Sequence, residues 1–395
     1  MSNYRRRMMQ KQEDEVIDIS LQDIYGNPIN RSTANCYVVR ETGQYKFPLV
    51  FGNAIKNGKV NTAAFTNNGG ANSHDFETLM GAIKSPYIYD VWGDDFSNEW
   101  WVSIENSDAD DAIADVTVVV DGQNSSIKFN VNSIPTTGAN YIITAHNSDV
   151  PIWSWHIWLW PHDLSPVEIT NSTGVKYNIM PVNLASKYDS DGVHIKNWFY
   201  QWGRPIPMLL PYAWNSSIDH TPGTIYRSNK ADELWQGVSN PTEFYYNFSS
   251  PYNWFGDKSY YNLWDAACTS TGNSDNDTVK TVYDPCPVGW KVPNGNTFTG
   301  LSVLSSANGI VKMRRYSGDT VGVGFPMSGC RLNSNGSLYS VGSYGYVWLS
   351  SANSQGSAYN LLFDSSSVNP QDDYGRARGF SVRPVEDDLT KIDEL

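Results

Sequence analysis

The chain has 395 residues, of which 13% are aromatic and 17% charged, so it carries enough apolar surface for packed cores and is not disordered by composition. Its 41 acidic and 28 basic residues give a net charge of −13, which disfavours a nucleic-acid partner because phosphate binding needs a basic face. The length predicts two or three domains, and no run of 18 apolar residues predicts a membrane span.

Residues 1–17 are predicted to form a polar leader. It contains three consecutive arginines, followed by a polar and acidic stretch in place of the apolar core of a signal peptide. A solvated tail is the simpler interpretation of the arginines, and a docking peptide is the alternative.

Strand signals dominate residues 18–160. Asp121 and Gly122 mark a bend between two segments in which apolar and polar residues alternate, and this predicts a β-hairpin. Strands are predicted at residues 45–51, 115–120, 127–131 and 141–145. Short strands at this spacing are typical of an immunoglobulin-like β-sandwich.

A tryptophan-rich block, Ile-Trp-Ser-Trp-His-Ile-Trp, occupies residues 152–158. Strand alternation places Trp153 and Trp155 on one face and Trp158 on the other. Such a block serves either as a glycan-stacking platform or as core packing. We favour core packing, because tryptophan buries a large area while its N–H finds a partner. His156 is expected to be a hydrogen-bonded structural residue.

Residues 161–395 differ in composition from the first part of the chain. They are rich in Trp, Tyr, Asn, Gly and Pro, have few periodic segments, and are predicted to form a second domain. A short helix is expected at residues 231–235, hairpins around residues 336–340 and 346–351, and a closing strand at residues 378–385. The acidic tail after this strand is expected to be exposed.

Cys286 lies between two prolines, which predicts a rigid corner with Trp290 anchored inward. A nucleophilic Cys286 would need a nearby base, and no histidine follows His220. A disulfide between two of the last three of the four cysteines is one alternative, and packed free thiols are the one we favour. Arg383 is expected to pair with a carboxylate or with backbone carbonyls.

Asn273, Asp275 and Asp277 place side-chain oxygens at alternate positions, as calcium loops do. The segment lacks the glycine and the glutamate of an EF-hand loop, so an Asx-rich turn is the interpretation that we favour over a calcium site. No other cofactor is predicted.

Sequence motifs of zinc proteases, P-loop enzymes, α/β-hydrolases and dinucleotide-binding enzymes are absent from the chain. Adjacent acids such as Asp372 and Asp373 are the residues that a glycosidase would use, but neighbouring residues on a strand point to opposite faces. The sequence therefore predicts a protein that is not an enzyme, with a glycan-active enzyme as an alternative.

Five blocks of the chain, in this order, resemble those of Bacteroidetes fimbrillin-like surface proteins that carry a C-terminal Fibrobacter succinogenes major paralogous domain. The blocks are Asn-Cys-Tyr at 35–37, Trp-Ser-Trp-His-Ile-Trp at 153–158, Tyr-Gln-Trp-Gly-Arg at 200–204, Tyr-Asp-Pro-Cys-Pro-Val-Gly-Trp-Lys-Val-Pro at 283–293 and Gly-Phe-Ser-Val-Arg-Pro-Val at 379–385. The resemblance covers residues 33–385. It implies a C-type-lectin-like fold for residues 161–395, an adhesive or structural role at a surface, and no catalytic residues.

We therefore expect a mostly β chain with some α+β character, an immunoglobulin-like β-sandwich followed by a C-type-lectin-like domain. The expected function is non-enzymatic attachment to a polysaccharide or cell-surface receptor. Family members usually begin with an export signal, which residues 1–17 lack, so we expect a phage virion fibre or decoration protein that docks onto other virion subunits as a homo-oligomer, foremost a trimer. A bacterial fimbrillin-like adhesin and a purely structural appendage subunit are the alternatives.

Overall fold

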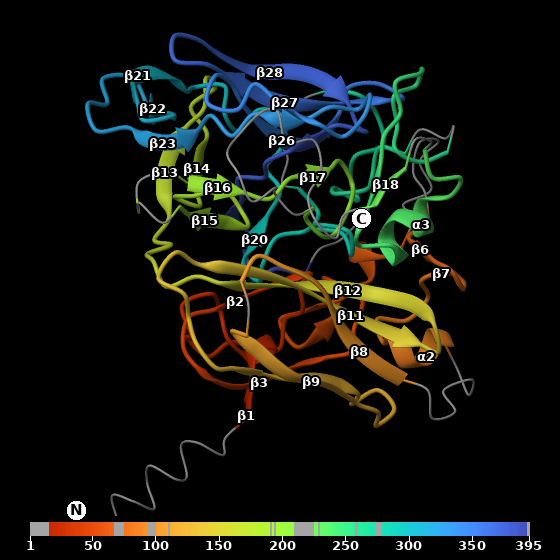
Figure 1. Cartoon of the computed structure of the whole chain (residues 1–395). Helices are drawn as coiled ribbons and strands as arrows, with labels where there is room; N and C mark the ends of the chain where they lie inside the picture. The colour runs from red at the N-terminus through yellow and green to blue at the C-terminus, as the bar shows by residue number, and fades with distance from the viewer. Residues whose placement is uncertain are drawn as a thin grey trace, which may run out of the picture.

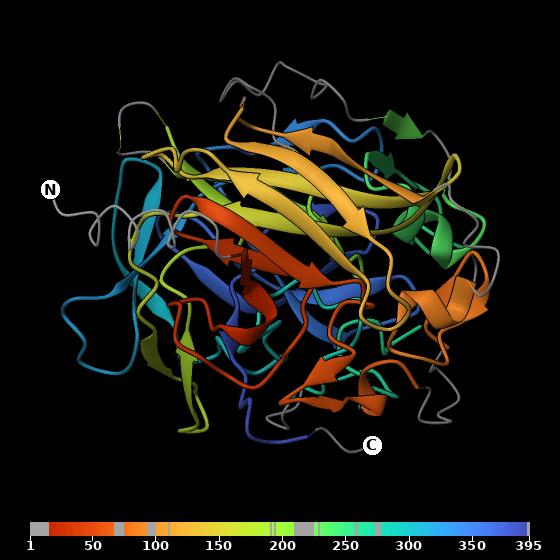
Figure 2. The same cartoon turned by 90° about the horizontal axis from the view of Figure 1, so that it is seen from below.

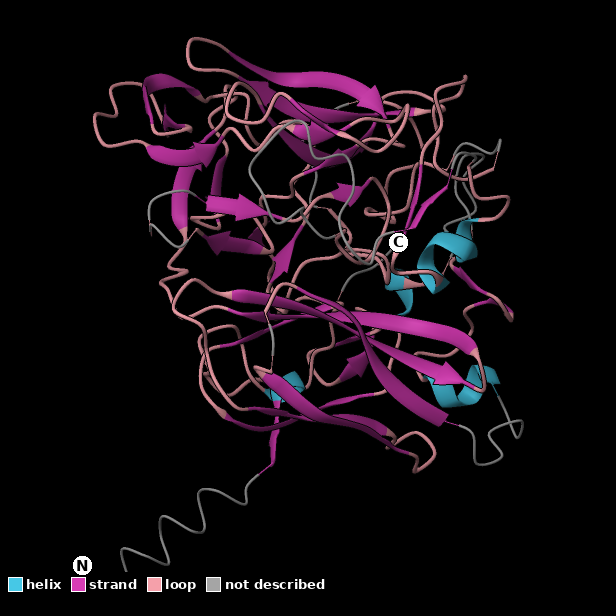
Figure 3. Ribbon diagram, viewed as in Figure 1, coloured by secondary structure: helices cyan, strands magenta, loops and turns pink. Residues whose placement is uncertain are grey.

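The computed structural model describes residues 16–66, 75–92, 100–109, 111–189, 192, 195–208, 225–227, 230–256, 260–272 and 278–392. In this part of the chain, regular structure consists mainly of strands in many small sheets, with a few short helices (Figure 3). The prediction of a mostly β chain is confirmed. None of the helices described is long and apolar enough to cross a bilayer.

Two four-stranded sheets lie face to face in the first half of the chain (Figures 1 and 2). One sheet has the order β1 (Val16–Asp18), β3 (Gly43–Pro48), β10 (Ser126–Val131), β9 (Ile113–Val119). The other has the order β2 (Cys36–Val39), β12 (Val150–Leu159), β11 (Ala139–Asn147), β8 (Trp100–Ser107). Aromatic rings fill the space between them: Phe47 lies 4.8 Å from Tyr37 and 5.3 Å from Trp155 between ring centroids.

The predicted hairpin is confirmed as the antiparallel pair β9–β10. Ile127 and Phe129 of β10 are buried, as the alternation predicted. A β-bulge interrupts the pairing near Asp115, which adopts a positive φ of 52° and accepts a hydrogen bond from Asn130 Nδ2 at 2.6 Å. The first strand begins at Val16, inside the segment predicted as a leader, and runs parallel to β3.

Short elements complete the first half. They are η1 (Ile19–Leu21), β4 (Ile55–Lys56), β5 (Lys59–Val60), η2 (Thr62–Ala64), β6 (Glu77–Thr78), β7 (Gly81–Ala82) and α2 (Ile88–Trp92).

The described residues of the second half form six small sheets joined by long irregular segments (Figure 1). Their strands are β13 (Val167–Thr170), β14 (Lys176–Ile179), β30 (Val385–Glu386) and β20 (Trp290–Lys291) in one sheet; β15 (Ser186–Tyr188) and β16 (Ile195–Asn197); β17 (Tyr200–Gln201), β29 (Gly379–Phe380), β24 (Cys330–Arg331) and β25 (Leu338–Tyr339); β18 (Ile225–Arg227) and β19 (Glu243–Tyr245); β21 (Ser302–Ala307), β22 (Ile310–Arg314) and β23 (Val323–Pro326); and β26 (Gly345–Ala352), β27 (Ser357–Phe363) and β28 (Val368–Gly375).

Two predicted elements of this half differ from those observed. The helix expected at residues 231–235 is α3 (Leu234–Ser239), which begins later because Glu233 and Gln236 form a capping box at its start. The closing strand expected at residues 378–385 is instead split into β29 and β30, which belong to different sheets. Pro384, which has no N–H, lies at the crossing between them, and its carbonyl accepts a hydrogen bond from the Met180 N–H.

One large apolar core extends through both halves. It contains Trp155 of the first half together with Trp202, Trp254 and Trp348 of the second. A smaller core, which includes Phe325, lies within the second half. Because the main core crosses residue 160, we expect the two halves to unfold together.

Candidate functional site

The tryptophans of the predicted block are all fully buried. Trp153 and Trp155 face the space between the two sheets, where Trp153 packs on Phe51 at 5.2 Å. Trp158 faces the second half and donates its indole N–H to the Ser186 carbonyl at 2.9 Å. None of these rings is open to a ligand at the surface.

His156 lies on the same face of β12 as Trp158 and is buried. Its Nε2 is 2.9 Å from Asn140 Oδ1, and its ring stacks on Trp198 at 6.1 Å. Burial lowers the pKa of His156 to about 3, so the ring is neutral at physiological pH.

Asn35, the first residue of the Asn-Cys-Tyr block, joins three of the five sequence blocks in space. Its Nδ2 donates to the carbonyls of Val282 at 2.6 Å and Asp284 at 2.8 Å, and its Oδ1 accepts the Trp153 indole N–H at 3.0 Å. Asn53 adds a further bond to the Asp284 carbonyl at 3.1 Å. These residues connect the two halves through buried hydrogen bonds, although Asn53 Oδ1 itself has no partner among the described residues.

Asp284 organises the corner around Cys286. Its carboxylate accepts the N–H of Cys286 at 2.7 Å and that of Val292 at 2.9 Å, and burial raises its pKa. Cys286 and Trp290 are both buried, and all four cysteines of the chain are free thiols. Burial also raises the pKa of Cys286 well above its usual range, which disfavours the reactive thiolate.

Arg383 is fully buried and bonds to uncharged oxygens. Its guanidinium donates to Asn183 Oδ1 at 2.7 Å and to the carbonyls of Met180 at 3.1 Å and Gly324 at 2.9 Å. It also lies 4.1 Å from the centre of the Phe325 ring. The residue therefore pairs with carbonyls, one of the two outcomes expected for it, and ties the final segment to the second half.

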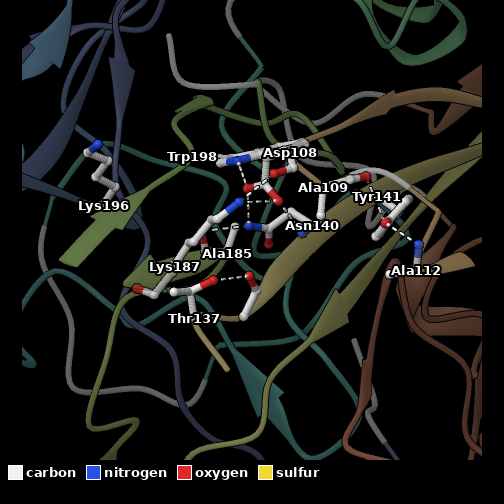
Figure 4. A network of polar contacts seen from close by, with 12 residues as sticks. Asp108, Ala109, Ala112, Thr137, Asn140, Tyr141, Ala185, Lys187, Lys196 and Trp198 are labelled. Carbon is white, nitrogen blue, oxygen red and sulfur yellow. Dashed lines mark hydrogen bonds and ion pairs between the residues drawn. The ribbon is translucent and has the colours of Figure 1, made fainter. Parts of the chain in front are cut away.

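A polar network joins the second four-stranded sheet to the second half (Figure 4). Asp108, just after β8, accepts hydrogen bonds from Asn140 Nδ2 and Trp198 Nε1, both at 2.9 Å. Its Oδ1 lies 3.5 Å from Lys187 Nζ. The network joins β11 to β15 and to Trp198, which follows β16.

The acidic tail is not exposed throughout, contrary to expectation. The Asp387 side chain is 5% exposed and lies 2.9 Å from Lys56 Nζ and 3.3 Å from Lys291 Nζ. These two lysines, which we call the lysine pair, belong to opposite halves of the chain. Although burial opposes it, their charge lowers the pKa of Asp387, so the tail is held by a buried ionic contact.

The calcium candidates Asn273, Asp275 and Asp277 lie outside the described residues. Within the part of the chain that the structure describes, no three His, Cys, Asp or Glu side chains gather as metal ligands would.

An exposed aromatic surface in the second half is the strongest candidate for ligand binding. Tyr339 is 51% exposed and Tyr344 is 39% exposed. Tyr374 and Arg378, both half-buried, lie near Tyr339. The Tyr346 ring connects the other tyrosine to them, with its centroid 6.4 Å from that of Tyr344 and 5.8 Å from that of Tyr374. We call Tyr339, Tyr344, Tyr374 and Arg378 the tyrosine surface.

The two exposed tyrosines stand at the ends of one turn between β25 and β26. Ser340, which has a positive φ of 57°, accepts hydrogen bonds at its carbonyl from the N–H groups of Ser343 and Tyr344, both at 3.0 Å. The Tyr344 carbonyl accepts the Gly329 N–H at 2.9 Å. A side chain at Gly329 would lie 2.3 Å from the Tyr339 carbonyl, so only glycine allows this approach. The turn is therefore held in place before any ligand binds.

Arg378 supplies hydrogen-bond donors next to these rings. Its guanidinium lies 4.5 Å from the centre of the Tyr374 ring, and Nη1 is 3.9 Å from Cys330 Sγ. Burial raises the pKa of Cys330 to about 12, so the thiol is neutral and does not compensate the charge. In the described part of the chain, Arg378 has no carboxylate partner. Asp372, two residues before Tyr374 on the same face of β28, offers an acceptor.

Exposed aromatic rings with a donor and an acceptor beside them are suited to stacking on a sugar ring while bonding its hydroxyl groups. Apart from Asp372, which was considered as a glycosidase acid, the sequence did not identify these residues as candidates for ligand binding. The Tyr-Ser-Val-Gly-Ser-Tyr segment at residues 339–344 is the available signal, since a glycine- and serine-containing turn between two tyrosines displays both rings.

Comparison of the chain with protein-family models, with curated proteins and with solved structures returned no match. The resemblance to fimbrillin-like proteins therefore stays a prediction.

Proposed function

We propose that this protein is a non-enzymatic, surface-displayed adhesive protein that attaches to glycans through the tyrosine surface. One observation carries the proposal: two exposed tyrosines on a braced turn lie near Arg378, whose charge no carboxylate of the described residues pairs. Tyrosine and arginine are also the residue types that contribute most to binding at protein surfaces.

For the finer fold, we propose an immunoglobulin-like sandwich for residues 18–160 and a C-type-lectin-like domain for residues 161–395. The two facing four-stranded sheets support the first, and the short strands with long irregular connections support the second. We further propose display on a phage virion as a homo-oligomer, foremost a trimer. Capsid and tail genes next to this gene would support the virion, and a pilus-type operon would place the protein on a bacterial surface. Light scattering gives the oligomeric state.

A glycan array probed with the full chain tests the adhesive role. The full chain is needed because its main core is shared between the halves. Binding that weakens in a Tyr339→Ala, Tyr344→Ala double variant supports the proposal. Absence of binding would favour a purely structural subunit, and release of shortened glycans would favour a glycan-active enzyme.

Tyr316→Ala is the matched control. Tyr316 is 47% exposed and has the Arg315 guanidinium 5.5 Å from its ring centre, so it is an exposed tyrosine beside an arginine at another place. Unlike Arg378, Arg315 is paired with a carboxylate, that of Asp319. Its loss should leave glycan binding unchanged.

A further inference from the structure

Trp101, on β8 in the first half, is an exposed tryptophan whose position is fixed. Its side chain is 44% exposed, and its indole N–H donates to the Ser148 carbonyl at 2.6 Å. One face of the ring stacks on His146, with 3.9 Å between centroids and 5° between planes. The exposed area therefore belongs mainly to the other face, which is presented as a rigid flat platform.

Polar groups surround this platform. His146 Nε2 lies 2.7 Å from Ser103 Oγ and 3.0 Å from Glu105 Oε1. Trp101, Ser103 and Glu105 therefore share one face of β8, the face that also carries the buried polar residues of β11 and β12. The hydrogen bonds that Glu105 makes with His146 and Ser103 lower the pKa of Glu105, so this half-buried carboxylate is ionised and accepts hydrogen bonds.

The group is not a catalytic triad, although it contains serine, histidine and a carboxylate. In a triad the carboxylate bonds one ring nitrogen and the serine the other. Here Ser103 and Glu105 both contact Nε2 of His146, and Nδ1 is buried without a hydrogen-bond partner. The arrangement orders a surface and provides no relay for a proton.

We propose that Trp101, with Ser103 and Glu105, forms a second saccharide site that takes one uncharged pyranose ring. The apolar face of the sugar stacks on the exposed face of the indole, and its hydroxyl groups bond to the carboxylate and the serine hydroxyl. The charge of Glu105 favours an uncharged sugar over a charged one. Glu105 repels acidic sugars, and its Oε1 is already in contact with Ser103 Oγ and His146 Nε2, which leaves less of the carboxylate to pair with a cationic sugar.

This site and the tyrosine surface lie in different halves of the chain, so they provide two contacts with a polymeric glycan. Two linked weak contacts give a binding strength well above either one, provided that one polymer reaches both.

NMR titration of the full chain tests the proposal. The Trp101 indole N–H resonance is assigned by its loss in Trp101→Phe, and the probes are neutral hexasaccharides of glucose, of mannose and of N-acetylglucosamine. We expect at least one probe to shift this resonance. Glu105→Gln should weaken the same binding about 5-fold, since a charge-assisted hydrogen bond is replaced by a neutral one. In Trp101→Ala, which lacks this resonance, the backbone N–H resonances of Ser103 and Glu105 should no longer shift on addition of the probe, while the melting temperature stays close to that of the parent.

The Tyr339→Ala, Tyr344→Ala double variant should retain the shift of the Trp101 resonance, which separates this site from the tyrosine surface. Ile104→Ala, another exposed position on β8, is the control for loss of a side chain. The proposal is overturned if none of the three probes shifts the resonance. It is also overturned if only a glucosamine hexamer with free amines does so, because the site would then bind cations.

Discussion

Replacing Asn35 with alanine is expected to destabilise the whole protein by about 2–6 kcal/mol. The Asp284 carbonyl keeps its bond from Asn53, but the Val282 carbonyl and the Trp153 indole N–H lose the partners that Asn35 provides. Each buried polar group left without a partner costs about 1–3 kcal/mol, and two such groups give the stated range.

Urea unfolding followed by tryptophan fluorescence measures this change. The shared core predicts one cooperative transition for the parent, and its midpoint should fall in Asn35→Ala. Asn30→Ala is the control, because Asn30 is exposed and, among the described residues, its side chain bonds only to that of Asn57, at 2.8 Å. A loss in Asn35→Ala below about 1 kcal/mol, or equal to that of the control, would refute the role assigned to this junction. Two separate transitions in the parent would refute the shared core.

Three further predictions concern stability. Asp387→Asn should lower the free energy of unfolding in denaturant by about 3–5 kcal/mol, because the buried lysine pair loses the charge of Asp387. The control Asp388→Asn, at an exposed position, should lower it by less than about 1 kcal/mol, and equal losses would contradict the role of the ionic contact. Burial raises the pKa of Asp265 to about 6, so the native state binds this proton more tightly than the unfolded chain. The Asp265 contribution to the free energy of unfolding should therefore rise as pH falls from about 6 to 4, and this rise should be missing in Asp265→Asn. If the free energy of unfolding depends on pH in the same way in the parent and in Asp265→Asn, the prediction is contradicted. Gly52→Ala would place a methyl group 2.3 Å from the Val282 carbonyl oxygen and should lower the melting temperature far more than Gly174→Ala, whose methyl group would meet no atom within 4 Å. Both glycines have a positive φ, so similar losses would contradict the role of this close contact.

The local pattern of the chain predicted much of the first half. Alternation placed Ile127 and Phe129 inward and put Trp155 and Trp158 on opposite faces of one strand, because strand side chains alternate whatever the partner is. The mostly β composition followed from the same signals. Element boundaries were less accurate, as α3 shows, because a capping box decided its start.

Contacts between distant segments were not predictable in this way. Asn35 meets a segment 247 residues further along the chain, and no local signal specifies that pairing. The burial of Asp387 depends on lysines from both halves of the chain. The acidic sequence of the tail does not show this pairing, and by itself it predicted an exposed tail. The exposure of Tyr339 and Trp101 likewise depends on what the rest of the fold leaves uncovered, which a single sequence does not show.

Glycan-array binding by the full chain and two variants tests the adhesive role most directly. Loss of two stacking tyrosines removes about 1–3 kcal/mol, so Tyr339→Ala, Tyr344→Ala should weaken binding to the preferred glycan by about 5- to 150-fold. Tyr316→Ala should bind as the parent does. No glycan bound by the parent, or equal binding by all three proteins, would contradict the account.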